Sequence, residues 1–126
     1  MPRQILPQAQ LHPAIQAKVT GYHSQVVQAV QAACAQHAVV IVGMRQNPFP
    51  KRARKALDAA AQPYHYMEYG SYWGQWQERL ALKIWTGWPT IPMVFIQGML
   101  VGGADDLIRL IEAGELADLL VKPTQA

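Results

Sequence analysis

The sequence predicts an α/β domain in which helices alternate with strands before a final hairpin and helix. Three observations support this prediction. Residues 38–42 form a continuous apolar run, A-V-V-I-V, which is typical of a buried central strand. Segments with helical periodicity lie on both sides of that run. Two short apolar segments flank Gln97-Gly98, and such a connection indicates a β-hairpin.

Length and composition fit one compact domain. The chain has 126 residues, of which 51% are hydrophobic and 15% are charged, so wholesale disorder is not expected. No apolar run approaches the length that spans a bilayer, and the N-terminus lacks the apolar core of a signal peptide. The single cysteine, Cys34, has no disulfide partner within the chain. These features predict a cytoplasmic protein with no membrane partner.

The first 20 residues carry Pro2, Pro7 and Pro13 among glutamines and alanines. We expect an extended arm over residues 1–20, which can include one helical turn, followed by a single domain over residues 21–126.

The first half of this domain is predicted to hold two helices around the central strand. The first helix covers residues 22–36, where apolar side chains recur at helical spacing, at Val26, Val27, Val30, Ala33 and Cys34. The strand at 38–42 follows. Asn47 is a good N-cap for the next helix, because Pro48 and Pro50 then fall in the first turn, where a missing N–H costs little. This helix ends before Pro63.

The second half is predicted to contain a strand, a helix, a hairpin and a last helix, at residues 64–69, 74–85, 92–96 with 99–101, and 105–120. Gly87 ends the middle helix, and Gly114 is a weak point in the last one. Strands joined through helices are parallel, whereas the hairpin adds an antiparallel pair. The resulting order is that of a thioredoxin-like fold, with a four-stranded mixed sheet flanked by helices and an extra helix at its start.

Two motifs in the second half resemble the glutaredoxins. Residues 88–92 read W-P-T-I-P, as in the monothiol branch of that family, and residues 102–106 read G-G-A-D-D. The resemblance extends from about Gln25 to Leu120. It implies a glutaredoxin-type thioredoxin fold and a groove for glutathione.

The resemblance also implies particular contacts. Pro92 would be cis, which would turn the main-chain N–H and C=O of Ile91 toward an extended tripeptide; the alternative is a plain proline at a strand entry. The helix start at Ala104 and Asp105 would hold the carboxylate of a γ-glutamyl group, and the Asp105 side chain would hold its ammonium. The alternative is that Asp105 or Asp106 only caps the helix.

Three basic residues are candidates for the ligand's other carboxylate. Arg79 and Lys83 lie four residues apart and share a helix face. In the monothiol branch the position of Arg79 contacts glutathione, and Lys83 is a less certain contact. Arg45 lies close to the position of a ligand-binding lysine in the family, where this chain has Met44. A solvated charged face that includes Glu78 is the alternative for the helix pair.

The chain departs from the family at the nucleophile. The stretch Asn47-Pro48-Phe49-Pro50 matches the family's C-P-Y-C, but Asn47 and Pro50 stand where the cysteines would be. Neither side chain can attack a disulfide, so no catalytic residue is assigned. Cys34 lies on an apolar helix stripe, where a free cysteine is usually a small core residue. Without a thiolate at the site, no iron–sulfur cluster is expected.

The remaining chemistry-bearing side chains show no enzyme signature. The four histidines have no metal-ligand spacing, so no metal site is predicted. Lys51, Arg52, Arg54 and Lys55 form a basic helix face, which is either solvated or a site for an anionic partner; nucleic-acid binding is not indicated. Tyr69, Tyr72, Trp73 and Trp76 are expected to pack in the core and at its rim, with a partner-binding surface as the alternative.

Three functions remain open at this point. The favoured one is a glutathione-binding or thiol-peptide-binding module without thiol–disulfide catalysis, with a role linked to cell redox homeostasis. The second is a working glutathione-dependent oxidoreductase that uses Cys34 or a partner's thiol. The third is a protein-interaction domain whose groove is unused. The favoured reading makes the chain a binding protein rather than an enzyme.

Overall fold

A four-stranded mixed sheet forms the centre of the protein, as seen in a computed structural model that describes residues 3–121. The strands follow the spatial order β2-β1-β3-β4, with bounds Val39–Gly43 for β1, His65–Glu68 for β2, Met93–Ile96 for β3 and Met99–Gly102 for β4. β1 pairs with β2 in parallel, and β3 runs antiparallel to both β1 and β4. The predicted fold class is confirmed.

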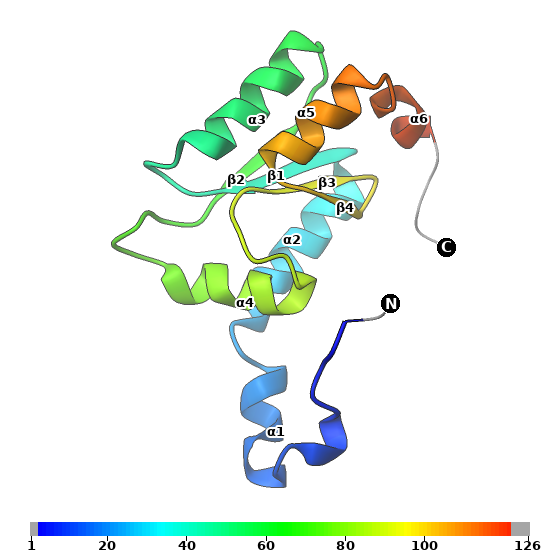
Figure 1. Ribbon diagram of the computed structural model, residues 1–126. Helices are drawn as coiled ribbons and strands as arrows, with labels where there is room; N and C mark the ends of the chain where they lie inside the picture. The colour runs from blue at the N-terminus through cyan, green and yellow to red at the C-terminus, as the bar shows by residue number, and fades with distance from the viewer. Residues whose placement is uncertain (1–2, 122–126) are drawn as a thin grey trace.

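Helices cover both faces of the sheet (Figure 1). α3 (Pro48–Ala59) and α5 (Ala104–Glu112) lie on one face, and α2 (Ser24–Gln36) and α4 (Trp76–Thr86) lie on the other. The sequence prediction placed α2, α3 and α4 within a few residues of these bounds, as well as the start of α5. Within residues 3–121, no helix is both long enough and apolar enough to cross a membrane.

The central strand is buried on both faces, which explains its continuous apolar run. Val40 and Val42 pack in the core beneath α2 and α4, whereas Val39 and Ile41 pack in the core beneath α3 and α5. Successive strand side chains point to opposite faces, so one strand supplies both layers. Each of these four side chains is almost fully buried.

The end of β1 approaches the start of α3 very closely. A Cβ at Gly43 would lie 2.9 Å from the Cβ of Pro50 and 2.7 Å from the ring of Tyr66. Only glycine therefore permits this approach. The close packing sets the first turn of α3 directly at the end of the central strand.

Two predictions about the ends of the chain are wrong. Residues 1–20 are not simply extended: η1 (Gln8–Gln10) is a 3₁₀ turn, and α1 (Pro13–Thr20) is a two-turn helix. The His12 ring supplies its cap, because Nδ1 accepts a hydrogen bond from the main-chain N–H of Ala14 at 3.0 Å. A boundary between the arm and the domain at residue 20 remains a prediction.

The last helix is two helices. Gly114, at φ 74°, ends α5 with a Schellman turn, in which the N–H groups of residues 114 and 115 donate to the carbonyls of Ile111 and Leu110. α6 (Leu116–Val121) follows. The sequence predicted that Gly114 would weaken the helix. Glycine accepts the left-handed conformation, so the helix ends at this residue instead of continuing through it.

Candidate functional site

An open groove of about 440 Å³ lies where the start of α3, the entry to β3 and the start of α5 meet. These segments are far apart in the sequence, but they converge at one end of the sheet. The lining residues come from five segments: Met44, Asn47 and Phe49, then Tyr72, then Lys83, then Trp88 to Pro92, and finally Gly103 to Asp106. The groove therefore brings together most of the residues that the sequence singled out.

The entry to β3 forms one wall. The Ile91–Pro92 peptide bond is cis, as the resemblance implies. The Ile91 side chain is buried against the core beneath α2 and α4. None of the turn, loop and cap hydrogen bonds within residues 3–121 engages the main chain of Ile91. Its N–H and C=O groups are therefore available to pair with an extended chain.

The first turn of α5 forms the adjoining wall. Asp106 caps the helix, since its Oδ2 accepts a hydrogen bond from the main-chain N–H of Gly103 at 3.0 Å. The N–H groups of Ala104 and Asp105 belong to the first turn, where the helix offers them no carbonyl. The alternative of a capping role thus holds for Asp106, and the Asp105 carboxylate stays outside the cap.

Asp105 has a different partner. Its Oδ1 lies 2.9 Å from Nη2 of Arg52 on α3. Both side chains are about half exposed, so solvent screens this ion pair. The pair connects the α3 wall of the groove with the α5 wall, and a ligand ammonium would compete with Arg52 for the carboxylate.

Of the predicted basic contacts, only Lys83 lines the groove. No carboxylate within residues 3–121 forms an ion pair with Lys83. Its ammonium is therefore a free positive charge at the groove, between the aromatic loop after β2 and the entry to β3.

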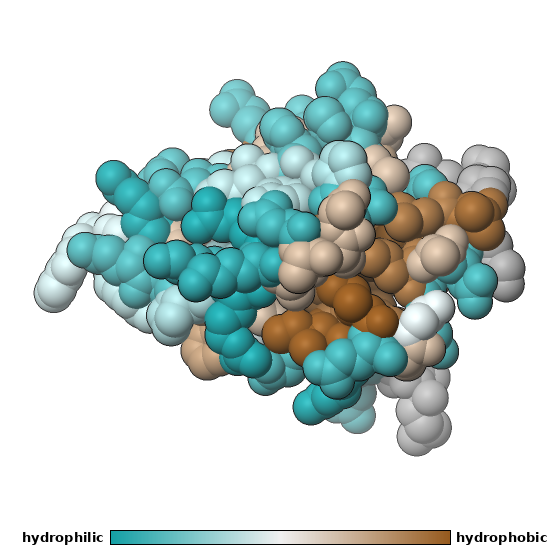
Figure 2. All heavy atoms as spheres, turned by 90° about the horizontal axis from the view of Figure 1, so that it is seen from above, coloured by the Kyte–Doolittle hydropathy of each residue, from teal (hydrophilic) through white to brown (hydrophobic). Residues whose placement is uncertain are grey.

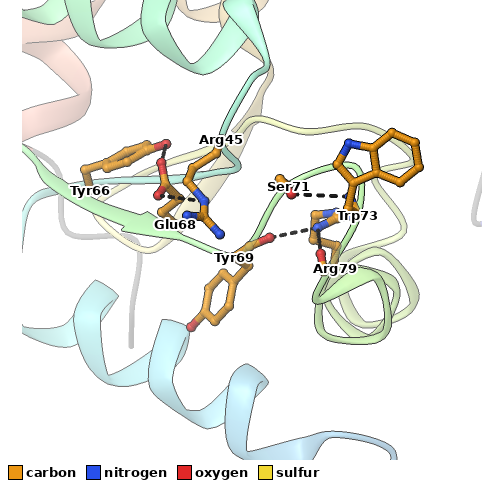
Figure 3. A network of polar contacts seen from close by, with 8 residues as sticks. Arg45, Tyr66, Glu68, Tyr69, Ser71, Trp73 and Arg79 are labelled. Atoms are coloured by element: carbon orange, nitrogen blue, oxygen red, sulfur yellow. Dashed lines mark hydrogen bonds and ion pairs between the residues drawn. The ribbon is translucent and has the colours of Figure 1, made fainter.

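Arg79 does not reach the groove. Its side chain is only 7% exposed, and its guanidinium donates to the carbonyls of Tyr69 at 2.8 Å and Gly74 at 2.7 Å. Figure 3 shows the guanidinium directed into the loop that joins β2 to α4. Arg79 holds this loop, and its expected role as a ligand contact is corrected for that reason.

Arg45 also points elsewhere. Its Nε lies 3.9 Å from an Oε of Glu68 at the end of β2 (Figure 3). Met44, the preceding residue, lines the groove instead. Successive residues at the end of a strand point to opposite sides. A shift of one residue in the alignment therefore decides whether Met44 or Arg45 is the residue that enters the groove.

The start of α3 forms the third wall, where the family has its cysteines. Asn47 Oδ1 accepts a hydrogen bond from the main-chain N–H of Phe49 at 3.0 Å, so Asn47 is the predicted N-cap. Pro50 is fully buried. The helix end that would stabilise a thiolate is capped by an amide, and neither Asn47 nor Pro50 offers a group that can attack a disulfide.

Cys34 is remote from the groove. It packs at the edge of the core beneath α2 and α4, and it lines a separate cavity with Trp85, Phe95 and Leu100. Burial raises the pKa of the Cys34 thiol to about 11. The predicted packing role fits this position, and the thiol is a poor nucleophile at neutral pH.

The aromatic residues after β2 are more exposed than predicted. Trp73 is 91% exposed, Tyr72 61% and Trp76 58%, and only Tyr69 packs against the core. The loop that carries Tyr72 and Trp73 extends beyond the sheet in Figure 1, and Figure 3 shows Trp73 directed away from it. The expectation of core packing therefore holds for Tyr69 and fails for Tyr72, Trp73 and Trp76, because this segment turns out of the sheet after Gly70.

Sequence reasoning missed Tyr72 and Trp88 as groove residues. The signal for Tyr72 was present: an aromatic side chain between Gly70 and Gly74 belongs to a turn, and turns lie at the surface.

The basic face of α3 is partly engaged. The Arg54 guanidinium lies 4.3 Å from the centre of the Tyr66 ring, and Arg52 pairs with Asp105, while Lys51 and Lys55 are exposed. Figure 2, a view onto the outer helix layer, shows hydrophilic side chains over much of this face and hydrophobic ones gathered to one side. The face is mainly solvated.

Metal ligands do not cluster in the part of the chain that the structure describes. No group of three or more His, Cys, Asp or Glu side chains within residues 3–121 is placed to hold an ion. Two histidines that are distant in sequence do meet: the rings of His37 and His65 stack in parallel at 4.3 Å between centroids.

Comparisons with known proteins point to one family. A "Glutaredoxin-like protein" of Dictyostelium discoideum is 40% identical over 104 residues, which covers 82% of this chain and 85% of that protein. "Glutaredoxin 4" of Haemophilus influenzae is 30% identical over 89 residues, covering 66% of this chain and 80% of the relative. No family model matches the chain.

Solved structures agree on the fold. A buckwheat glutaredoxin, determined as a complex with glutathione, superposes with a TM-score of 0.68 over 79% of this chain and 91% of its own. Its sequence identity is 24%. The similarity therefore concerns the arrangement of the sheet and its helices.

Proposed function

Because this chain belongs to the family of glutaredoxins and glutaredoxin-like proteins, we propose that it binds glutathione in the groove without catalysing thiol–disulfide exchange. The observation that carries the proposal is the pairing of an intact groove with an amide at the nucleophile position. Asn47 caps α3 where a thiolate would be needed, while the cis bond before Pro92 and the open first turn of α5 are both present.

Each part of glutathione has a matching group. The γ-glutamyl carboxylate suits the free N–H groups of Ala104 and Asp105, and its ammonium suits the Asp105 carboxylate. The cysteinyl main chain pairs with Ile91 as a strand pairs with a sheet edge. Lys83 neutralises the glycyl carboxylate, a contact that we first expected of Arg79. The buckwheat complex with glutathione supports this choice of ligand.

Binding without reaction makes the protein a sensor or carrier of a thiol peptide rather than a disulfide exchanger. A cytoplasmic location suits a chain with one unpaired cysteine. Cluster ligation through the groove is not expected, because Asn47 provides no thiolate to bind iron.

Isothermal titration with reduced glutathione tests the proposal. We expect binding at millimolar ligand or tighter, weakened about three- to tenfold by Lys83→Ala, because one charge-assisted contact is lost. Lys51→Ala is the matched control: it removes an exposed lysine of α3 that does not line the groove, and affinity stays unchanged. Absence of binding at millimolar glutathione contradicts the proposal.

The exposed aromatic loop favours a second candidate, a protein-interaction domain. Trp73 is too exposed to contribute to the core, and large exposed aromatic side chains are common at interfaces. A stable protein partner whose binding is lost in Trp73→Ala, together with a groove that does not bind glutathione, would favour this candidate over the first.

A further inference from the structure

We propose that the preferred ligand of the groove is a glutathione whose sulfur carries an apolar substituent, a thioether S-conjugate rather than the free thiol. This inference rests on the proposed function. It concerns which member of the glutathione class the groove selects, and it follows from what surrounds the position where the ligand sulfur would lie.

No group at that position favours a free thiol. In a groove with a cysteine at residue 47, the thiolate of that cysteine could attack a disulfide that includes the ligand sulfur, and the other sulfur would leave as a thiolate. Here the Asn47 side chain cannot form a bond to sulfur, and its Oδ1 is occupied by the main-chain N–H of Phe49. This groove offers the ligand sulfur no thiol chemistry. A glutathione whose sulfur already carries a carbon substituent therefore gives up no reaction when it binds here.

Two partly exposed aromatic side chains belong to the lining of the groove. Phe49, in the first turn of α3, is 46% exposed, and Tyr72, in the loop after β2, is 61% exposed; both line the groove. Glutathione itself has no apolar group large enough to cover them. An apolar substituent on the sulfur would cover ring surface that the tripeptide leaves in water.

The aromatic wall is held in place rather than loose. Arg79 binds both ends of the loop that carries Tyr72, through the carbonyls of Tyr69 and Gly74. Within the loop, Ser71 Oγ accepts a hydrogen bond from the main-chain N–H of Trp73 at 3.2 Å, as drawn in Figure 3. A fixed wall lowers the entropy that ligand binding must overcome.

Charged side chains line the same groove, so the site as a whole is amphiphilic. Lys83 and Asp105 line it together with the two rings, and the Arg52 guanidinium that pairs with Asp105 lies 5.6 Å from the centre of the Phe49 ring. An S-conjugate has the same combination, with a zwitterion and a second carboxylate on the tripeptide and an apolar group on its sulfur.

Titrations with four ligands test the inference: reduced glutathione, S-methylglutathione, S-benzylglutathione and glutathione disulfide. We expect S-benzylglutathione to bind about tenfold more tightly than reduced glutathione, or better, because one ring is removed from water. S-Methylglutathione should gain little. Glutathione disulfide should gain nothing, since its substituent is charged and polar.

Two variants assign the gain to the aromatic wall. The double variant Phe49→Ala, Tyr72→Ala should bind S-benzylglutathione no better than reduced glutathione. Trp76→Ala is the control, because Trp76 is about as exposed as Tyr72 but does not line the groove; the preference should remain. Circular dichroism checks that each variant is folded.

Failure of the inference and failure of the proposed function are distinguishable. Equal or weaker binding of S-benzylglutathione, with reduced glutathione still bound, overturns the inference alone, as does a preference that persists in the double variant. If neither ligand binds, both fall.

Discussion

The joined walls of β3 and α5, taken together as one wall, differ from the α3 wall in what they share with the family. The wall built by β3 and α5 has the cis bond before Pro92 and an open helix start at Ala104. The wall built by α3 begins with a capped helix, but Asn47 and the buried Pro50 occupy the positions that correspond to the family's cysteines. In the proposed function, recognition belongs to the β3 and α5 walls, whereas a reaction would need a thiol on the α3 wall, so the two would use separate residues.

The difference teaches that recognition depends on backbone geometry, whereas reaction depends on one side chain. A strand edge and a helix end are fixed by the whole fold, so they persist when a single residue changes. A nucleophile disappears with one substitution. The chain therefore belongs to the family by its fold, while its α3 wall carries no cysteine.

The largest expected effect comes from Asn47→Cys, which places a thiol on the otherwise unreactive wall. The helix end should lower the pKa of the new thiol below its ordinary value of about 8.5. Glutathione-dependent reduction of a small mixed disulfide should then rise about a thousandfold or more above the wild-type background.

The same substitution in a Cys34→Ala background is the control, and it should retain the full gain. A reactive new thiol that leaves disulfide reduction at background would show that the binding wall is also lost. The comparison between the walls would then be wrong.

The second effect concerns Cys34, the only thiol that could replace the missing one. Burial raises its pKa to about 11 in the folded protein, so far less thiolate is present at pH 8 than for an ordinary thiol. Alkylation by iodoacetamide at pH 8 should be about 200-fold slower in the folded protein than in urea.

The sign of the linked stability follows from the raised pKa. The neutral thiol is favoured by folding, so its contribution to stability is present below about pH 8.5 and is lost as the pH rises toward 11. Cys34→Ala should therefore weaken the alkaline decline in the free energy of unfolding. Fast alkylation at pH 8, together with disulfide exchange that disappears in this variant, would restore the oxidoreductase hypothesis.

The third effect separates the two cations on α4. Arg79→Met removes buried hydrogen bonds to the carbonyls of Tyr69 and Gly74, and it should lower the free energy of unfolding by about 2–3 kcal/mol. Lys83→Ala should change it by less than about 0.5 kcal/mol, because Lys83 has no partner to lose among the described residues. Urea titrations measure both changes in the free energy of unfolding. A larger loss in Lys83→Ala than in Arg79→Met would make Arg79 a candidate ligand contact again.

The fold was largely predictable from the sequence because apolar periodicity and turn residues are local signals. The strand at 38–42, the cap at Asn47 and the hairpin turn at Gln97 all follow from a few neighbouring residues. The main-chain features of the site were expected from the resemblance to the glutaredoxins, which rests on the short motifs at residues 88–92 and 102–106.

Side-chain directions were not predictable in the same way. Arg79 and Lys83 share a helix face by spacing, but only the position of the loop at Tyr69 to Gly74 decides that Arg79 turns under it. The exposure of Trp73 likewise depends on where that loop leaves the sheet. These outcomes rest on contacts between distant segments, which a linear pattern does not contain.

The smallest expected effect tests the link between the two walls. Arg52 on α3 holds the Asp105 carboxylate at 2.9 Å, the same group that is proposed to bind the ligand ammonium. An exposed ion pair contributes about 0.2–1 kcal/mol, so removing the competitor should tighten glutathione binding by no more than about fivefold. Arg52→Gln, titrated with reduced glutathione, measures this gain.

Lys55→Gln is the matched control, since it removes the same charge from an exposed position on α3 that pairs with no carboxylate among the described residues. Added salt should reduce the difference between Arg52→Gln and wild type, because screening already weakens the pair. Weaker binding in Arg52→Gln would mean that Arg52 attracts a ligand carboxylate instead. The α3 wall would then still take part in recognition, and only its reaction would have been lost.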